Sequence, residues 1–370
     1  MSQFNTFVGL DVHKDSIAIA VAEAGRESAK FLGTIPNDAS RLRSRLKRFG
    51  APESVLICYE AGPTGYGLYR KLLEWGYTCE VIAPSRTPRK SADHIKTDRR
   101  DAERLAHYLR SGDLTAIRVP TEEEEAMRDL LRAREDAKQA EKRAKKQLGM
   151  FLLRHGRIWS GQSNWTLKHM LWIGAQGFDN EADTIVLGDY LHEVRRLTER
   201  VKSLTTSIEE LVPSLECYPL IVALQALRGV KTLVATWVAI EIGDFRRFPS
   251  ARHFMSFLGV TPSESTSGDT RRLGAITKAG NVRLRSILMQ SAWAYRLTPR
   301  VEGTLLRRNR RASEPVRDIA WKAQERLHRK LHRLTAKGKP KNKALVAVAR
   351  ELAGFIWSIA RQPVLVHQEA

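Results

Sequence analysis

The chain has 370 residues, of which 42% are hydrophobic and 28% are charged, so it can build a sizeable core, and wholesale disorder is excluded. Its 62 Lys and Arg residues exceed its 41 Asp and Glu residues and leave a net charge of +21. Because such an excess repels itself unless a polyanion offsets it, nucleic acid is the expected partner. The N-terminus lacks the pattern of a signal peptide, and the most apolar windows, 233–243 and 344–360, are interrupted by charged residues. We therefore expect a cytoplasmic protein without a membrane anchor.

The first hundred residues alternate between strand and helix patterns. The predicted strands are 4–10, 16–21, 30–35, 54–59 and 79–83. The predicted helices are 37–49, 65–75 and about 97–110. A turn at Gly25 joins the second and third strands as a hairpin or meander, and helices separate the later strands. This order predicts an α/β domain with a mixed sheet.

The middle of the chain predicts two long helices. Thr121 and Glu124 have the spacing of a capping box, which opens a highly charged helix running to about residue 155. A second helix starts near Asn180 and ends before Pro213. It carries a heptad seam of Val194, Leu197, Val201, Leu204, Ile208 and Leu211. Such a seam either packs inside its own chain or joins subunits as a coiled coil.

From about residue 216 onward the sequence predicts an all-α region. Helices at 220–227 and 233–242 flank a turn at Gly229, as in a helix-hairpin-helix that offers backbone N–H groups to phosphate, although any αα-hairpin looks similar. Residues 271–343 contain 21 Lys and Arg residues and four acidic residues. Because a solvated face normally mixes both signs, this segment is expected to bind a phosphate backbone.

Four acidic residues lie where a shared site can form. Asp11 and Glu60 each follow a predicted strand, and parallel neighbours place such strand ends side by side. Asp98 and Asp101 are three residues apart and share one face of a helix. A divalent cation would offset the cost of holding these like charges together, and carboxylate ligands suit Mg²⁺ or Mn²⁺ rather than zinc.

Each acid also has a purely structural explanation. Asp11 could cap a turn, Asp98 could be a helix N-cap, and Glu60 and Asp101 could pair with basic residues nearby. His13, beside Asp11, could assist the site, although a histidine in a surface turn is the commoner case. The metal site is favoured because the four acids occur together on two strands and a helix.

Three of these segments resemble the DEDD transposases of bacterial insertion sequences: VGLDVHK (8–14), EAGPTGY (60–66) and KTDRRDA (96–102). Segments 248–262, 267–268, 274–281 and 284–285 resemble the second transposase domain of the same family. The resemblance implies an N-terminal RuvC-like domain with the RNase H fold, in which Asp11, Glu60, Asp98 and Asp101 hold Mg²⁺ or Mn²⁺. The stretch after Glu60 is longer than in most of the family, which puts the local turn rather than the glutamate in question.

The resemblance also implies a serine nucleophile that attacks DNA. Ser267 fits best because a glycine follows it, but Ser263 and Ser265 lie close enough to compete. The residues alone would favour a loop serine without a catalytic role. The expected nucleic-acid-binding residues are Arg271, Arg272, Lys278, Arg283 and Arg285.

These observations predict four parts: a RuvC-like metal-binding domain (1–115), a helical coiled-coil middle for oligomerisation (116–215), an all-α transposase domain with the serine (216–300) and a basic helical extension (301–370). The resemblance implies a bacterial, nucleoid-associated DNA transposase or recombinase. It would act as a dimer or tetramer on double-stranded donor and target DNA, guided by a structured bridge RNA. Two other functions compete: a metal-dependent nuclease or junction resolvase without serine chemistry, and a non-catalytic nucleic-acid-binding protein.

Overall fold

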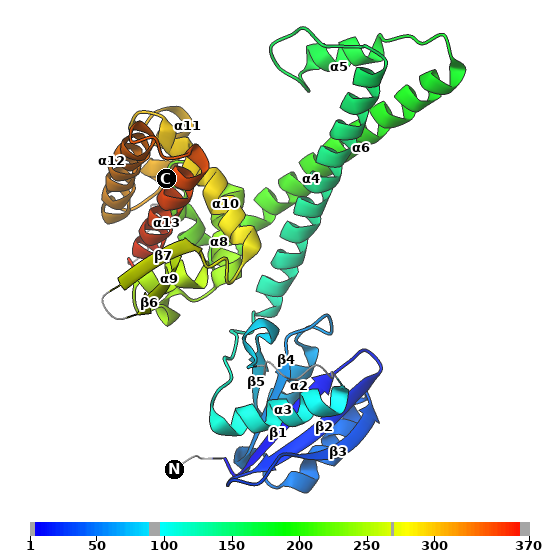
Figure 1. Cartoon of the computed structure of the whole chain (residues 1–370), viewed down its shortest axis with the longest axis vertical. Coiled ribbons are helices and arrows are strands. Elements are labelled where there is room, and N and C mark those ends of the chain that lie inside the picture. Colours follow the sequence, from blue (N-terminus) through cyan, green and yellow to red (C-terminus); the bar gives the residue numbers. More distant parts are fainter. Residues whose placement is uncertain (1–3, 89–96, 268–269, 363–370) are drawn as a thin grey trace. The chain divides into compact units, whose positions relative to one another are not determined.

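A computed structural model describes residues 4–88, 97–267 and 270–362 of the chain (Figure 1). The chain divides into two compact units, Met1–Pro120 and Thr121–Ala370. In the described residues no helix combines the length and the apolar character needed to span a membrane.

The first unit is built on a five-stranded mixed sheet in the order β3-β2-β1-β4-β5. Its strands are β1 (Thr6–Val12), β2 (Ser16–Glu23), β3 (Lys30–Pro36), β4 (Val55–Glu60) and β5 (Thr78–Ile82). Strands β1, β2 and β3 pair antiparallel as a meander, whereas β4 pairs parallel with both β1 and β5. This sheet with its helices is RNase H-like, which confirms the predicted fold class.

Helices cover both faces of this sheet. One face packs on α1 (Ala39–Leu46) and α2 (Gly67–Glu74), which bury Leu42 and Leu72. The other face packs on α3 (Asp98–Ser111) through the buried side chains Ala102, Leu105, Ala106 and Leu109 (Figure 1). Short 3-10 turns at Lys47–Phe49, Pro52–Ser54 and Pro84–Arg86 complete the unit.

The second unit begins with two long helices that pack along each other, α4 (Glu122–Arg154) and α6 (Glu181–Leu211) (Figure 1). The capping box of Thr121 and Glu124 is present at the start of α4. The short helix α5 (Leu167–Gly174) lies between them in sequence. Seam residues Val194, Leu197, Val201 and Ile208 are buried within this chain, so internal packing alone explains most of the seam.

The rest of the second unit is a helical region around one core. Its helices are α7 (Tyr218–Leu224), α8 (Thr232–Ile242), α9 (Ala251–Phe257), α10 (Val282–Ala292), α11 (Gly303–Arg310), α12 (Glu314–Ala336) and α13 (Lys341–Ala360). The 3-10 turns are Val212–Ser214, Phe245–Arg247 and Trp293–Arg296. Helix α13 packs against α9, α10 and α12 and buries an apolar face. The tail beyond residue 300 therefore shares a core with the preceding helices.

Two features of this helical region differ from expectation. A β-hairpin of β6 (Pro262–Ser267) and β7 (Thr270–Ile276) interrupts the helices and was not predicted. The turn at Gly229 packs against its own chain, because a Cβ there would stand 2.4 Å from the carbonyl oxygen of Ser291. Arg228 in the same turn donates to the carbonyls of Leu297 and Thr298. Internal contacts thus account for this turn without phosphate.

Candidate active site

Two predicted acids lie at the carboxyl ends of neighbouring parallel strands. Leu10 of β1 pairs with Tyr59 of β4, so the next residues, Asp11 and Glu60, occupy adjacent register positions. Side chains alternate along a strand, and Cys58 packs toward α3, so the Glu60 position also belongs to the α3 side of the sheet. The prediction that these two strand ends are neighbours is therefore confirmed.

Helix α3 brings the other two acids to the same side of the sheet. Thr97 is its N-cap, with its hydroxyl accepting from the backbone N–H of Arg100, so Asp98 and Asp101 fall in the first turn. Gly9 of β1 permits the close packing of this helix, since a Cβ there would stand 2.4 Å from the backbone nitrogen of Ala106. Lys96 of the same motif lies outside the described residues.

Asp11, His13 and Asp98 form the centre of the candidate site. One possible ligand atom from each lies within 4.8 Å of the others. The Nε2 atom of His13 is 3.3 Å from Asp11 Oδ2 and 3.5 Å from Asp98 Oδ1, so the imidazole lies between two carboxylates. The side chain of Asp11 is 20% exposed, against 58% for Asp98. The position of His13 two residues after Asp11 is the sequence signal for this contact.

Burial and neighbouring charges both act on the Asp11 carboxyl. Burial raises the pKa of the Asp11 carboxyl, His13 lowers it, and the charges of Asp101 and Asp98 raise it, with a net upward shift. The charge of Asp101 therefore contributes to the raised pKa of Asp11, although Asp101 itself forms an ion pair with Arg104. A pairing of Asp101 with a basic residue nearby is the structural explanation considered for it above.

Glu60 has a different partner. The hydroxyl of Thr87 donates to Glu60 Oε1 at 2.7 Å. Among the described residues, the compact ligand set contains Asp11, His13 and Asp98 but neither Glu60 nor Asp101. The structure thus brings together two of the four predicted carboxylates, with Asp101 near enough to act electrostatically and Glu60 at the adjacent strand end.

The donors present fit a hard divalent cation. The carboxylates of Asp11 and Asp98 supply oxygen ligands, which Mg²⁺ and Mn²⁺ prefer. A bound cation would also offset the burial and the repulsion that raise the pKa of Asp11. His13 could act as a ligand or as a hydrogen-bond partner that orients Asp11.

The three candidate serines lie on the exposed strand β6 of the second unit. The hydroxyl of Ser263 donates to the carbonyl of Ala275 across the hairpin at 3.1 Å, so it serves the hairpin itself. Ser265 and Ser267 are exposed and pair with Arg272 and Thr270, respectively. Gly268, which follows Ser267, lies outside the described residues. The geometry therefore favours Ser265 and Ser267 over Ser263 as accessible hydroxyls.

The predicted nucleic-acid-binding residues divide into exposed and buried members. Arg272 and Lys278 are exposed, and Arg271 lies opposite Thr266 in the hairpin. Arg283 is partly exposed and 3.8 Å from the carboxylate of Asp136. Arg285, expected at a DNA surface, is instead buried.

The guanidinium of Arg285 joins the backbone segments on the two sides of the hairpin. It donates to the carbonyls of Leu258 and Ala279, each at 3.1 Å. Its charge therefore serves the fold, and a contact with phosphate would require those hydrogen bonds to break.

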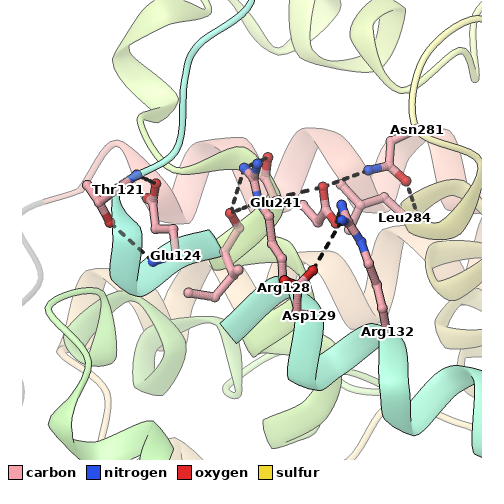
Figure 2. A network of polar contacts seen from close by, with 9 residues as sticks. Thr121, Glu124, Arg128, Asp129, Arg132, Glu241, Asn281 and Leu284 are labelled. Carbon is pink, nitrogen blue, oxygen red and sulfur yellow. Dashed lines mark hydrogen bonds and ion pairs between the residues drawn. The ribbon is translucent and has the colours of Figure 1, made fainter. Parts of the chain in front are cut away.

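A buried glutamate ties this region to the long helix α4. Glu241 at the end of α8 accepts from Asn281 Nδ2 at 3.0 Å and from Arg132 at 3.4 Å, while Arg128 donates to the Ile240 carbonyl at 3.1 Å (Figure 2). The amide oxygen of Asn281 in turn caps α10 by accepting from the N–H of Leu284. Glu241, with a side chain 7% exposed, thus fixes the segment that leaves β7.

Comparisons with known proteins agree with these observations. Residues 8–156 match a DEDD-type family model described as a transposase, and residues 222–303 match one described as the IS116/IS110/IS902 family of transposases. The chain is 45% identical over 358 residues to a putative transposase of Sinorhizobium fredii, covering 96% of this chain and 88% of that protein. It is 32% identical over 345 residues to the transposase of an insertion sequence element, IS1533, of Leptospira borgpetersenii, covering 90% and 97%.

Proposed function

We propose that this chain, which belongs to the IS116/IS110/IS902 family of transposases, cuts and rejoins DNA strands with the acids of its first unit and a serine of its second. As a transposase it is a DNA-processing enzyme, and its substrate DNA is that of a bacterial cell, where we expect it to act at the nucleoid. The observation that carries the proposal is the cluster of Asp11, His13 and Asp98 in a domain matched by the DEDD family model.

Asp11 and Asp98 would hold Mg²⁺ or Mn²⁺, with Glu60 and Asp101 as further oxygen donors. When bound, the cation supplies positive charge to phosphate oxygens and lowers the pKa of a hydroxyl or water beside it. His13 orients the Asp11 carboxylate through its 3.3 Å contact. The ion pair between Arg104 and Asp101 keeps a basic group next to the cluster.

Ser267 is the proposed nucleophile. Its Oγ would form a bond to a DNA phosphorus while the bond from that phosphorus to the 5′ or 3′ oxygen breaks, and the hydroxyl proton passes to the leaving oxygen. Attack by another DNA end reverses the step and releases the serine, so the number of phosphodiester bonds is conserved without an external energy source. Arg272 and Lys278, both exposed near the hairpin, would neutralise the phosphate charge.

Two partners complete the proposal. A structured bridge RNA would select the sites by base pairing, and the basic surface of the second unit, which includes most of the 21 Lys and Arg residues of 271–343, would hold nucleic-acid backbones. Exchange between two duplexes needs several active sites, which supports a dimer or tetramer. Sequencing of RNA that co-purifies with the chain should recover one discrete structured species, whereas random fragments would count against guidance.

The serine chemistry is tested with a labelled DNA substrate under denaturing conditions. Ser267→Ala should lose the covalent protein–DNA adduct and recombination while keeping DNA binding. Ser265→Ala is the matched control, because it removes a hydroxyl from the same face of the same exposed strand. If Ser265→Ala loses the adduct and Ser267→Ala keeps it, the nucleophile is Ser265. If both variants still cleave DNA and Asp11→Asn does not, the chain is a metal-dependent nuclease without serine chemistry. If Asp11→Asn alters only stability, the acids are not catalytic.

A further inference from the structure

A hollow of about 320 Å³ on helix α4 has no role in the chemistry above. Its lining includes four lysines, one carboxylate and one aromatic ring: Lys138, Lys142, Lys145, Lys146, Glu141 and Trp165. The lysines come from a little over two turns of α4, and the tryptophan comes from the segment before α5. The hollow is therefore a concentration of positive charge beside an aromatic side chain.

The single carboxylate of the hollow cannot balance these charges. Glu141 has a side chain only 4% exposed and accepts from Lys138 at 2.7 Å, from Lys145 at 2.6 Å and from the Thr198 hydroxyl at 3.1 Å. These bonds lower the pKa of Glu141 to about 2, although burial alone would raise it. The carboxylate of Glu141 is thus already hydrogen-bonded to residues of α4 and α6.

Two exposed lysines remain beside it. Over the described part of the chain, no hydrogen bond or ion pair reaches Lys142 or Lys146. Lys138, Lys142 and Lys146 follow one another at steps of four, and like charges at this spacing destabilise a helix. A bound polyanion would remove that cost.

The tryptophan is held in a fixed position at the hollow. Trp165 has φ of +64°, a backbone conformation that side-chain-bearing residues rarely adopt. Its backbone N–H donates to His169 Nδ1 at 2.8 Å, and burial lowers the pKa of His169. The Lys145 ammonium lies 5.3 Å from the ring centroid. A constrained ring beside a row of ammonium groups suits a base next to its backbone phosphates.

We propose that this hollow binds single-stranded nucleic acid, with Lys142 and Lys146 on successive phosphates and an unpaired base against Trp165. A duplex satisfies the phosphate contacts but keeps its bases stacked and unavailable to the ring, so a single strand uses the whole site. The inference rests on the proposed function only in taking nucleic acid as the partner. An RNA loop and a displaced DNA strand share this chemistry.

The test is fluorescence anisotropy of the full chain with labelled oligo(U), oligo(dT) and duplex DNA over a range of salt concentrations. Lys142→Glu with Lys146→Glu should weaken single-strand binding at least about tenfold. It should also lower the salt slope, the slope of log affinity against log salt concentration, by about 1.4, the value for two phosphate contacts. The matched control is Arg200→Glu with Lys202→Glu, an equal change of charge at exposed positions of α6. A comparable loss in the control would assign the effect to net charge and overturn the site.

The ring is tested separately. Trp165→Ala should weaken single-strand binding about 5- to 100-fold, leaving the salt slope and duplex binding unchanged. Trp165→Phe should retain part of the affinity, and unchanged circular dichroism would show that the fold persists. Equal losses for single strands and duplex, or no effect of Trp165→Ala, would overturn the proposal.

The two single-stranded oligonucleotides, oligo(U) and oligo(dT), distinguish an RNA ligand from a DNA ligand. A larger loss with oligo(U) than with oligo(dT) supports an RNA loop, and the reverse supports a displaced DNA strand. Ser267→Ala should bind oligonucleotides like the unmodified chain. Failure of the serine chemistry would therefore leave this site standing, and failure of this site would leave the transposase chemistry standing.

Discussion

A Cβ atom on Gly9 of β1 would stand 2.4 Å from the carbonyl oxygen of Ala102 in α3. The backbone of the helix therefore lies directly against the strand at Gly9. This contact sets how close the first turn of α3, which carries Asp98, comes to Asp11 two residues along β1. The packing of one glycine thus determines the geometry of the candidate metal site.

Gly9→Ala should move α3 away from the sheet and disturb the site. Overpacking of this kind costs about 1–3 kcal/mol of unfolding free energy. Gly67→Ala at the start of α2 is the control, because a Cβ there has no atom within 4 Å. Urea unfolding should show the loss in Gly9→Ala alone, and equal stability of the two variants would contradict the close contact.

Removal of one acid should separate cation binding from folding. Asp11→Asn removes a partly buried charge and its repulsion with Asp101 and Asp98, so the metal-free protein should be as stable as the unmodified chain or slightly more stable. The rise in melting temperature on addition of Mn²⁺ should be lost, because a ligand is gone. Asp15→Asn, an exposed acid in the turn after β1, should retain that rise. A full Mn²⁺ effect in Asp11→Asn would exclude this cluster as the metal site.

Some of this site could be predicted from the sequence, because strand ends and helix first turns have characteristic patterns. Asp11 and Asp98 do lie together, on the elements predicted for them. The hydrogen bond between Glu60 and Thr87 could not be predicted, because the partner is 27 residues away, beyond α2 and β5. The bridging position of His13 depends on where α3 lies, which a local pattern does not specify.

The second unit was predicted less completely. Strand β6 reads PSESTS and is exposed, so it shows none of the apolar alternation by which strands are recognised. Arg285 is buried because its guanidinium donates to two backbone carbonyls, and no sequence pattern indicates these hydrogen bonds. The heptad seam of α6 was recognised, but its partner, α4 of the same chain, became evident only in the structure.

The hydrogen bonds of Glu141 predict how the α4–α6 pair responds to acid. Its pKa is lowered to about 2 in the fold, so its contribution to stability is present above its ordinary value of 4.5 and is lost as the pH falls toward 2. Hydrogen exchange of α6 amides measures the local free energy of unfolding. By this measure the unmodified chain should be more stable than Glu141→Gln above pH 4.5, and the gap between them should narrow as the pH falls toward 2. Glu199→Gln, at an exposed ion pair, should show almost no gap at any pH. A gap that stays constant would mean that Glu141 titrates normally.

Glu241 should be a large contributor to the stability of the second unit. Glu241→Ala removes the carboxylate that accepts from Arg132 and from the capping residue Asn281 and that lies 4.0 Å from the Arg128 guanidinium. Loss of a buried charged partner of this kind costs about 3–5 kcal/mol. Asp129→Asn removes an exposed acid 3.7 Å from the same Arg132 and should cost less than about 1 kcal/mol. Chemical unfolding of both variants measures the difference. Similar costs for the two variants would show that the network of Figure 2 contributes little to the free energy of unfolding.

Substitutions of two arginines near the hairpin should have opposite effects: one should change DNA affinity and the other the free energy of unfolding. Arg272 is exposed, so Arg272→Ala should weaken binding to all DNA sequences and reduce the slope of log affinity against log salt by about 1, with stability unchanged. Arg285 is buried against two carbonyls, so Arg285→Ala should cost about 1–3 kcal/mol of unfolding free energy and leave the salt slope unchanged. Binding titrations at several salt concentrations, paired with urea unfolding, give both quantities for each variant. A reduced slope in Arg285→Ala would mean that the guanidinium leaves its carbonyls to contact phosphate, because a residue confined to the core releases no counterions when DNA binds.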